Sequence, residues 1–494
     1  MAARRMPTVA LLAAATALAA VLRLALLDSR SLWFDETYTA TVVAAGGPGE
    51  LWDRVGATES TPPLFYALTW AWTAVAGDGE AALRTVSAVA LIAAVPVAYP
   101  TLRRFVGERA ALATAAILAV SPLLVHYALD ARAYGLLVLC GLLSVWACGA
   151  VLERPGRRRW IAWVAAAAAT IWTHWFGGFL VLGEAVALAW LLAGRRRELA
   201  LACAAVAATL LPGAWLLAEQ AGDGRAAFIE GIPLADRVEQ LVRQFALGPN
   251  VPRGWLEAAG LALALAGLAA GTLRAIEWSL LPARASRGDQ PIEGGARALL
   301  AIVAVALVAP LALAALGVYD RFNPRNSIAV VPLLAALAAV GLLRLRAVPL
   351  ALYLAVAATA SVWTAADWRY QTPDWRAAID AARATDPDAI VAATPLGGPT
   401  ATHYLGRPPA AGPLTARRIT IVVEPERAPG RRELAPTTHP ALDTLATAFP
   451  DRSERVELGF RIVTLTAPDP VPLDPATLSG ALAYPAGRAS REPL

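Results

Sequence analysis

Two adjacent carboxylates, Asp35 and Glu36, follow directly after the first apolar segment of the chain, within Ser31–Tyr38. Trp33 and Phe34 precede them, and amphipathic aromatic rings are enriched at membrane–water interfaces. A carboxylate at the edge of a low-dielectric medium is costly to charge and usually has a function. Such a group can take a proton from a hydroxyl as a general base. We therefore expect Asp35 to be a catalytic base at a membrane surface; the simpler alternative is a pair of solvated loop acids beside a helix end.

The segment His126–Tyr134 places Asp130, Arg132 and Tyr134 at the start of another apolar block. The planar fork of an arginine suits phosphate oxygens, so Arg132 is a candidate for binding an anionic headgroup. The alternative is that Asp130 and Arg132 pair with each other and anchor a helix end. Glu59 precedes two prolines, a residue type tolerated in the first turn of a helix. It is equally compatible with a functional role and with a solvated loop.

His174 lies in a very short turn between two apolar blocks and is flanked by tryptophans. It suits donation of a hydrogen bond to a phosphate or sugar, and equally a structural role. Arg321 and Arg325 stand in the segment Tyr319–Asn326, which the topology derived below places on the outer side. Arginines there run against the positive-inside trend, which indicates an anionic partner. Asp320 paired with Arg321 alone would be an ordinary rim pair.

The composition is that of a membrane protein. The chain has 494 residues, of which 57% are hydrophobic and 16% charged, whereas soluble domains carry about 25% charged residues. The apolar residues form blocks of roughly 18 to 22, which is the length needed to cross a bilayer. The basic residues are all arginine and cluster in short loops. The formal net charge of +5 therefore does not indicate nucleic-acid binding.

The positions of the arginines set the number of spans. The apolar blocks are Thr8–Leu27, Pro62–Gly77, Ala81–Leu102, Ala110–Tyr127, Ala133–Leu152, Trp160–Thr173, Gly177–Ala193, Leu199–Ala218, Gly254–Leu273, Ala296–Gly317, Asn326–Leu343 and Ala347–Ala365. If all of them crossed the membrane, three arginine-rich loops would lie outside, against the positive-inside rule. If Pro62–Gly77 is instead an outer juxtamembrane or re-entrant helix, all of these loops become cytoplasmic. We therefore expect an all-α polytopic membrane protein with about eleven transmembrane helices, its N-terminus inside and its chemistry facing outward.

From about residue 366 the apolar blocks stop and the composition becomes that of a soluble domain. A short helix is predicted over Trp375–Ala384, with strands at Ala389–Ala393, Ile419–Val423 and Val456–Leu465. We expect residues 1–365 to form a transmembrane catalytic domain, with an outer loop at 28–80. Residues 366–494 would form a small extracytoplasmic α/β domain. Its end, Asp469–Leu494, is rich in Pro and Ala and is predicted to be poorly ordered.

The first apolar segment is too long for a signal-peptide core, and no clear small-residue cleavage site follows it. We expect a first transmembrane helix, with Arg23 near its outer end either snorkelling or facing the protein interior. Cys140, Cys148 and Cys203 lie inside apolar blocks without metal-ligand spacing. There is no Walker A, GxGxxG, HExxH or GxSxG motif. No visible ligand set demands a metal ion or another cofactor, although a divalent metal is compatible with the sequence.

The motifs resemble a known family when they are taken together. Leu32-Trp33-Phe34-Asp35-Glu36 is similar to the acidic motif of GT-C glycosyltransferases, in particular the protein O-mannosyltransferase and aminoarabinose-transferase-like enzymes of bacteria. Further stretches resemble family blocks in the same order, namely Pro62-Pro63-Leu64-Phe65-Tyr66, Asp130-Ala131-Arg132-Ala133-Tyr134, His174-Trp175-Phe176-Gly177 and Arg325-Asn326. Thr61 departs from the pattern, because many members carry His before the two prolines.

The resemblance implies an inverting glycosyltransferase (a hexosyl- or pentosyltransferase) of the cytoplasmic membrane. It would move a sugar from a polyprenyl-phosphate donor in the bilayer to an acceptor hydroxyl outside, on a glycan, a lipid or a protein. Asp35 matches the base position of the family, and Glu36 would position the base or the acceptor. The candidate donor-binding residues are Arg132, His174, Arg321, Arg325, Glu59, Tyr134 and Asp130.

Two other functions remain open at this point. A transporter or flippase of lipid-linked sugars would use the same basic pocket without a base. A non-catalytic scaffold in envelope glycan assembly would need neither. The chemistry of Asp35 distinguishes the first of these from an enzyme, because only the enzyme needs a basic carboxylate at that position.

Overall fold

The computed structural model describes residues 2–222, 224–225, 227–280, 290–394, 396–428, 431–432, 439–478 and 480–485. The chain divides into two compact units. One comprises residues 1–27, 41–249 and 253–363, and the other comprises residues 28–40, 250–252 and 364–494. The division after residue 363 lies close to the predicted boundary. The stretch Asp28–Ala40, which carries the acidic motif, groups with the second unit.

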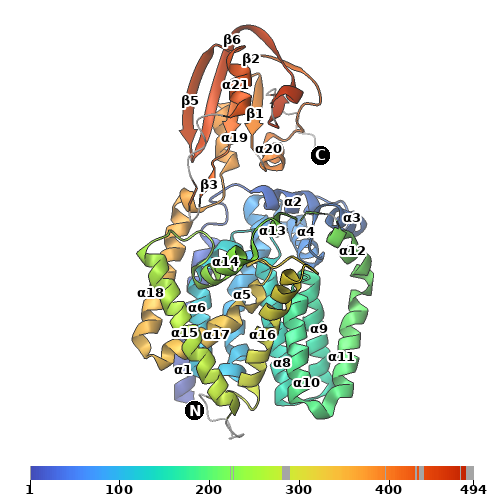
Figure 1. Ribbon diagram of the computed structural model, residues 1–494, viewed down its shortest axis with the longest axis vertical. Coiled ribbons are helices and arrows are strands. Elements are labelled where there is room, and N and C mark those ends of the chain that lie inside the picture. The colour runs from blue at the N-terminus through green and yellow to red at the C-terminus, as the bar shows by residue number, and fades with distance from the viewer. Residues whose placement is uncertain are drawn as a thin grey trace. The chain divides into compact units, whose positions relative to one another are not determined.

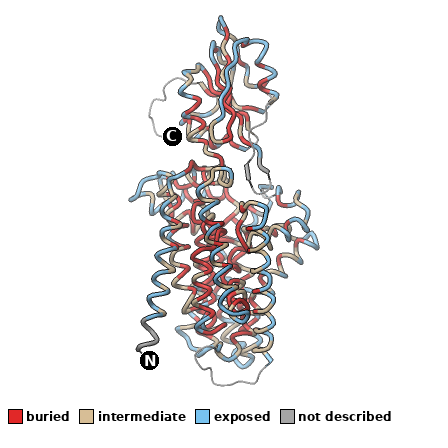
Figure 2. The backbone as a smooth tube through the Cα atoms, turned by 90° about the vertical axis from the view of Figure 1, so that its left-hand side faces the viewer, coloured by how far each residue is buried: buried red, intermediate tan, exposed pale blue. Residues whose placement is uncertain are grey.

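The first unit is a bundle of helices whose inner members are buried on all sides (Figures 1 and 2). Helix α8, for example, is apolar around its whole circumference, as expected of a helix surrounded by others. The helices are α1 (Ala2–Leu24), α3 (Pro48–Thr58), α4 (Leu64–Ala76), α5 (Glu80–Val106), α6 (Glu108–Val120), α7 (Pro122–Ala128), α8 (Tyr134–Glu153), α9 (Arg157–Thr173), α10 (Gly177–Leu191), α11 (Arg196–Leu210), α12 (Ala214–Gly222), α13 (Ala227–Glu230), α14 (Leu234–Leu247), α15 (Trp255–Leu280), α16 (Gly295–Ala315), α17 (Val331–Arg344) and α18 (Ala347–Ala366).

All the segments predicted to span are helical. Among the described residues, seven helical segments are long and apolar enough to cross a membrane, and the bent pair α6 and α7 would be an eighth. The remaining predicted spans, α9, α10 and the segment Ile328–Arg344, are helical but shorter. Helix α4 has 13 residues, or about 20 Å, against about 30 Å for a hydrocarbon core. It is therefore the short helix expected at Pro62–Gly77.

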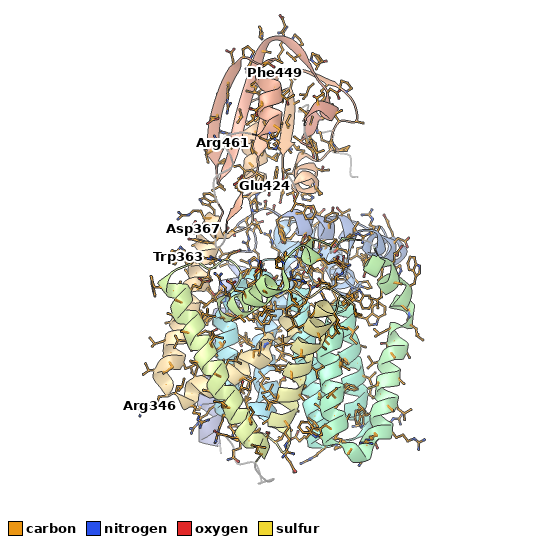
Figure 3. All side chains as sticks on the ribbon, in the orientation of Figure 1. Arg346, Trp363, Asp367, Glu424, Phe449 and Arg461 are labelled. Atoms are coloured by element: carbon orange, nitrogen blue, oxygen red, sulfur yellow. The ribbon has the colours of Figure 1, made fainter. Side chains whose placement is uncertain are left out.

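The arginine-rich loops meet at one end of the first unit. Arg104, at the end of α5, lies 3.3 Å from the Glu153 carboxylate at the end of α8, and its carbonyl accepts a hydrogen bond from Ile292. Arg346, in the connection between α17 and α18, and Trp363, towards the other end of α18, mark opposite ends of this unit in Figure 3. The turns that carry the predicted site residues begin α8 and end α9, so they lie at the end opposite the arginine-rich loops.

A buried arginine completes the break between α6 and α7. Ser121 and Pro122 interrupt the helix with a bend of 53°, which leaves the last carbonyls of α6 without helical partners. The guanidinium of Arg23 donates to the carbonyls of Leu118 and Ala119, each at 2.8 Å, and Ser361 donates to the next carbonyl, that of Val120. Arg23 therefore faces the protein interior, one of its two expected orientations.

Helices α15 and α17 pack backbone against backbone. A Cβ atom added at Gly271 would collide with the carbonyl oxygen of Leu337, and one added at Gly341 would collide with the carbonyl oxygen of Gly267. Small residues allow this close approach between membrane helices, where van der Waals packing drives association. The glycines are therefore a requirement of the helix contact.

The second unit contains a five-stranded sheet with the strand order β5-β6-β2-β1-β7 (Figure 1). The strands are β1 (Ala389–Ala393), β2 (Leu414–Val423), β5 (Asp451–Glu457), β6 (Phe460–Leu473) and β7 (Leu482–Pro485), and a separate two-residue pair is formed by β3 (Arg427–Ala428) and β4 (Arg431–Arg432). Only β1 and β2 are parallel in the large sheet. The helices are α19 (Trp375–Arg383), α20 (Gly398–Leu405) and α21 (Pro440–Ala446), while α2 (Phe34–Val43) brings the acidic motif.

Both faces of this sheet are covered. Ile390 and Ala392 belong to a core with α19 and α20, and their neighbours Val391 and Ala393 belong to a core with α21. This alternation follows from the two-residue period of a strand. The α/β architecture of the tail is confirmed, and so are the predicted strands at Ala389–Ala393 and Ile419–Val423. The prediction of a single strand at Val456–Leu465 is wrong, because Leu458 and Gly459 form the turn between the antiparallel strands β5 and β6. The prediction that residues from 469 onward are poorly ordered is wrong up to residue 485, because β6 runs to Leu473 and β7 pairs with β1. Residues 486–494 lie outside the described part of the chain.

The α15–α17 contact predicts that Gly271→Ala destabilises the protein by about 1–3 kcal/mol, because the added methyl group must push two backbones apart. Gly178→Ala in α10 is the matched control, since its Cβ meets nothing within 4 Å. Thermal unfolding of the purified protein measures both. Equal melting temperatures for the two variants would contradict the packing argument.

Candidate active site

The acidic motif begins α2, and its two carboxylates stand in the first turn of that helix. Glu36 is fully buried, and its Oε2 accepts the N–H of Trp33 at 3.2 Å. A Glu that reaches back to the residue preceding the helix satisfies one of the backbone donors left over at a helix start. Asp35 is partly exposed. The two adjacent acids therefore differ in burial, and Glu36 is the one that accepts the Trp33 N–H.

The residues just before α2 are tied into the second unit. The Ser31 hydroxyl accepts the N–H of Trp375 at 2.8 Å and lies 3.2 Å from the Pro373 carbonyl oxygen. The N–H of Leu32 donates to the hydroxyl of Tyr404 at 2.6 Å. Ser31 and Leu32 have no exposed surface. These hydrogen bonds therefore fix the position of the backbone just before α2.

In the first unit, Glu59 and Arg132 form a buried two-pronged ion pair. The guanidinium nitrogens of Arg132 lie 2.8 and 2.7 Å from the two carboxylate oxygens. The side chain of Glu59 is 2% exposed and that of Arg132 is 12% exposed. The guanidinium also stands 5.9 Å from the centre of the Tyr66 ring. Glu59, whose role the sequence left open, is therefore the partner that fixes Arg132.

A second layer of hydrogen bonds holds the loop that carries Glu59. Arg225 donates to the backbone carbonyl of Glu59 at 2.9 Å. The side-chain amide of Gln220 donates to the carbonyl of Thr61 at 3.1 Å, and its oxygen accepts the indole N–H of Trp175. The loop after α3 is thus connected to α12 and to the turn that holds His174.

His174 lies in the turn between α9 and α10 and is buried. Its Nδ1 accepts the N–H of Phe176 at 3.1 Å, so the proton of the neutral ring is on Nε2. Burial, together with the positive charges of Arg325 and Arg132, lowers the pKa of His174 to about 3. This histidine is therefore a neutral hydrogen-bond donor at physiological pH.

Arg325 adds the second cation to this group. Its guanidinium carbon stands 5.9 Å from the ring centre of Tyr134 and 5.3 Å from that of Phe228, distances typical of cation–π contacts. The Tyr134 ring lies 5.9 Å from the His174 ring. Five of the predicted donor-binding residues are therefore brought together, and we name this group the cationic cluster: Glu59, Arg132, Tyr134, His174 and Arg325.

The two remaining candidates are placed differently. Asp130 is buried, and its carbonyl accepts the N–H of Arg132 at 2.8 Å. Arg321 lies 3.5 Å from Glu230 of α13. Asp320, which the sequence allowed as a rim partner of Arg321, instead makes a two-pronged pair with Arg237 of α14. Arg237 was not singled out from the sequence, because nothing near it in the chain points to a partner 83 residues away.

Two further observations concern possible ligand sites. Within the described residues, His, Cys, Asp and Glu form no group of three or more that could hold a metal ion. Glu184, inside α10, is fully buried and accepts hydrogen bonds from Ser144 at 2.7 Å and Trp163 at 2.6 Å. It joins α8, α9 and α10, and its place within an apolar block gave no sign of function in the sequence.

The buried neutral state of His174 has a consequence for stability. An unfolded histidine binds its proton near pH 6.5, whereas the folded one does so only near pH 3. The unfolded state therefore binds more protons between these values, and stability falls as the pH drops through this window. Between pH 7.5 and pH 5 the loss is about 2 kcal/mol.

We predict that His174→Asn, which cannot titrate in this range, loses less stability than the wild type between pH 7.5 and pH 5. Thermal unfolding followed by tryptophan fluorescence measures the difference. The carbonyl oxygen of the asparagine can still accept the Phe176 N–H, which limits other damage. Parallel pH dependence of the two proteins would contradict the neutral, buried state.

Known proteins share this architecture. Residues 60–215 match the family model described as dolichyl-phosphate-mannose-protein mannosyltransferase, a range that includes Arg132 and His174. No curated protein sequence matches the chain. The structure of ArnT from Cupriavidus metallidurans bound to undecaprenyl phosphate aligns with a TM-score of 0.53 at 15% identity, over 92% of this chain and 98% of that chain. The oligosaccharyltransferase of Archaeoglobus fulgidus, tethered with an acceptor peptide, aligns with a TM-score of 0.49 at 13% identity, over 76% of this chain and 56% of that chain.

The match to ArnT confirms the fold that the motifs implied. The family match covers the segment from α4 to α12 and indicates a membrane glycosyltransferase. This chain is accordingly a multi-pass membrane protein with the fold of ArnT, and its residues 60–215 resemble the dolichyl-phosphate-mannose-protein mannosyltransferase family.

Proposed function

We propose that this protein is an inverting glycosyltransferase that takes a sugar from a polyprenyl-phosphate donor and attaches it to a hydroxyl group outside the cytoplasmic membrane. The observation that carries the proposal is the cationic cluster. It combines two arginines with a neutral histidine whose Nε2–H is available as a donor. The cluster lies at the end of the helical unit opposite the arginine-rich loops.

The cluster suits the leaving group of such a reaction. When the bond between the sugar and the phosphate breaks, negative charge develops on the departing phosphate. Preorganised positive groups stabilise that charge without reorganising during the reaction. We assign Arg132, Arg325 and His174 to the donor phosphate, with the polyprenyl chain in the bilayer. ArnT, which has the same fold, was crystallised with undecaprenyl phosphate.

We assign the acceptor side of the reaction to Asp35. Its carboxylate would take the proton of the acceptor hydroxyl as the oxygen attacks the anomeric carbon, and the carbon–phosphate oxygen bond would break with inversion. Asp35 is the partly exposed acid of the motif, whereas Glu36 is occupied by the backbone of Trp33. We therefore propose Asp35 as the base and Glu36 as the group that holds the helix start.

The positions of the arginines support an orientation for this chemistry. Arg104, Arg344 and the loops around them lie at one end of the helical unit, and cytoplasmic loops are enriched in arginine. We propose that this end faces the cytoplasm, with the cationic cluster at the outer face. We also propose that the second unit, which carries Asp35, lies outside the cytoplasm, because eleven crossings from a cytoplasmic N-terminus place the C-terminal domain there.

The base assignment predicts that Asp35→Asn lowers the turnover of a purified polyprenyl-phosphate sugar by at least about 100-fold, because the amide keeps the shape but cannot take a proton. Asp53→Asn, the same change at an exposed acid of α3, is the control and should retain wild-type turnover. Transfer by the Asp35→Asn variant at the wild-type rate would exclude the base. The transporter is favoured instead if the wild type itself consumes no polyprenyl-phosphate sugar, because a transporter needs only the cations.

The phosphate assignment predicts that Arg325→Gln weakens binding of polyprenyl phosphate by roughly 10- to 100-fold, the worth of a hydrogen bond to a charged group. Arg54→Gln is matched in charge change, since Arg54 forms a surface pair with Glu50. Equilibrium binding in detergent or nanodiscs measures both variants. If the two lose affinity equally, general charge attraction explains the binding and the specific assignment fails.

A further inference from the structure

The second unit holds the acidic motif by groups that belong to different parts of its fold. Trp375, which donates its N–H to Ser31, is the first residue of α19. Tyr404, which accepts the N–H of Leu32, lies near the end of α20. These bonds join residues that are 344 and 372 positions apart in the chain. The segment before α2 is therefore held from two helices of the α/β domain.

The holding groups stand on a rigid base. Trp375 is buried in the core that covers one face of the sheet, and its ring lies against the position where Gly397 would carry a Cβ atom. The carbonyl of Tyr404 accepts a hydrogen bond from Arg383 at the end of α19, at 2.9 Å. Neither holding group can shift without disturbing α19, α20 or their packing on the sheet.

The held point is very close to the proposed base. Leu32 is three residues before Asp35 and directly precedes Trp33, whose N–H is capped by Glu36. The position of Leu32 and the direction of α2 together set where the Asp35 carboxylate stands. A buried backbone donor must find an acceptor, and here the acceptor is the tyrosine hydroxyl.

We propose that the C-terminal α/β domain is a positioning part of the transferase, and that Tyr404 is a positioning residue that fixes the acidic motif through Leu32. The proposal rests on the assigned role of Asp35. It gives the domain a task in catalysis that is distinct from binding either substrate. A small displacement of a catalytic group can lower turnover by as much as 100-fold without any change in its chemistry.

The test is Tyr404→Phe in the full-length purified enzyme, because this change removes only the acceptor hydroxyl. We expect kcat to fall about tenfold, with the KM for the polyprenyl-phosphate donor unchanged within about twofold, since the donor phosphate is assigned to other residues. Thr444→Ala in α21 is the control. It removes a hydroxyl of the same domain that donates to the Pro440 carbonyl, on the face of the sheet opposite α19 and α20, and it should leave kcat at the wild-type value.

Ser31→Ala provides a second, independent variant, because it removes the acceptor of the Trp375 N–H and should lower kcat in the same way. Thermal unfolding of each variant shows whether a loss of turnover exceeds what the loss of stability explains. The proposal is overturned if Tyr404→Phe turns over at the wild-type rate, if it raises KM instead of lowering kcat, or if Thr444→Ala loses as much turnover. If Asp35→Asn is fully active in the same assay, the base assignment fails and the positioning role fails with it.

Discussion

The ion pair between Glu59 and Arg132 is the interaction on which the cluster-bearing end of the helical unit depends. Two charges removed from water are tolerated only when each satisfies the other, and removal of one partner leaves an uncompensated buried charge. The two prongs of the pair fix both the position and the plane of the guanidinium. Arg225 and Gln220 in turn hold the loop on which Glu59 stands. The pair thus fixes one cation of the cluster in place before any ligand binds.

The same pair shapes the electrostatics of its neighbours. Arg132 and Arg325 both act on His174, and their charges together with burial keep its ring neutral. A third positive charge at that point would be repelled and would have to be desolvated. A neutral imidazole avoids both costs and still offers one N–H, because Phe176 occupies the other ring nitrogen. The cluster therefore combines two point charges with one directed donor. That combination can hold a phosphate while adding less positive charge than three cations would.

The sequence predicts those features that depend on local patterns of charge and polarity. The arginine-rich loops determined which apolar blocks cross, because the positive-inside rule is a property of the chain alone, and α4 is short as that argument required. The sequence predicts the strand at Ala389–Ala393 correctly because the signals for it, its composition and the residues at its two ends, lie within that stretch of the chain. Strand β7 was missed, because its Pro- and Ala-rich surroundings have low strand propensity. It is a strand because it pairs with the buried β1.

Partner choice was beyond the sequence for a different reason. Asp130 is the acid nearest to Arg132 in the chain and was the obvious alternative partner. The side chain of Glu59, 73 residues away, forms a two-pronged pair with the arginine, and nothing near Arg132 in the chain indicated it. In the same way, nothing local indicated that Tyr404 would meet Leu32. Contacts of this kind follow from the fold, so the residue types of a site can be read from a sequence more readily than its pairings.

In the acidic motif, the fold gives two chemically similar side chains different surroundings. Asp35 and Glu36 are adjacent acids, and either could be a base on composition alone. A helix start must satisfy its leading N–H groups, and the longer side chain of Glu36 reaches back to Trp33 to do so. A carboxylate committed to a backbone donor is less available to abstract a proton, because protonation would weaken the hydrogen bond it accepts. The shorter acid, Asp35, stands one residue earlier at a partly exposed position. This difference in burial and bonding supports the proposal that Asp35 is the reactive member of the pair.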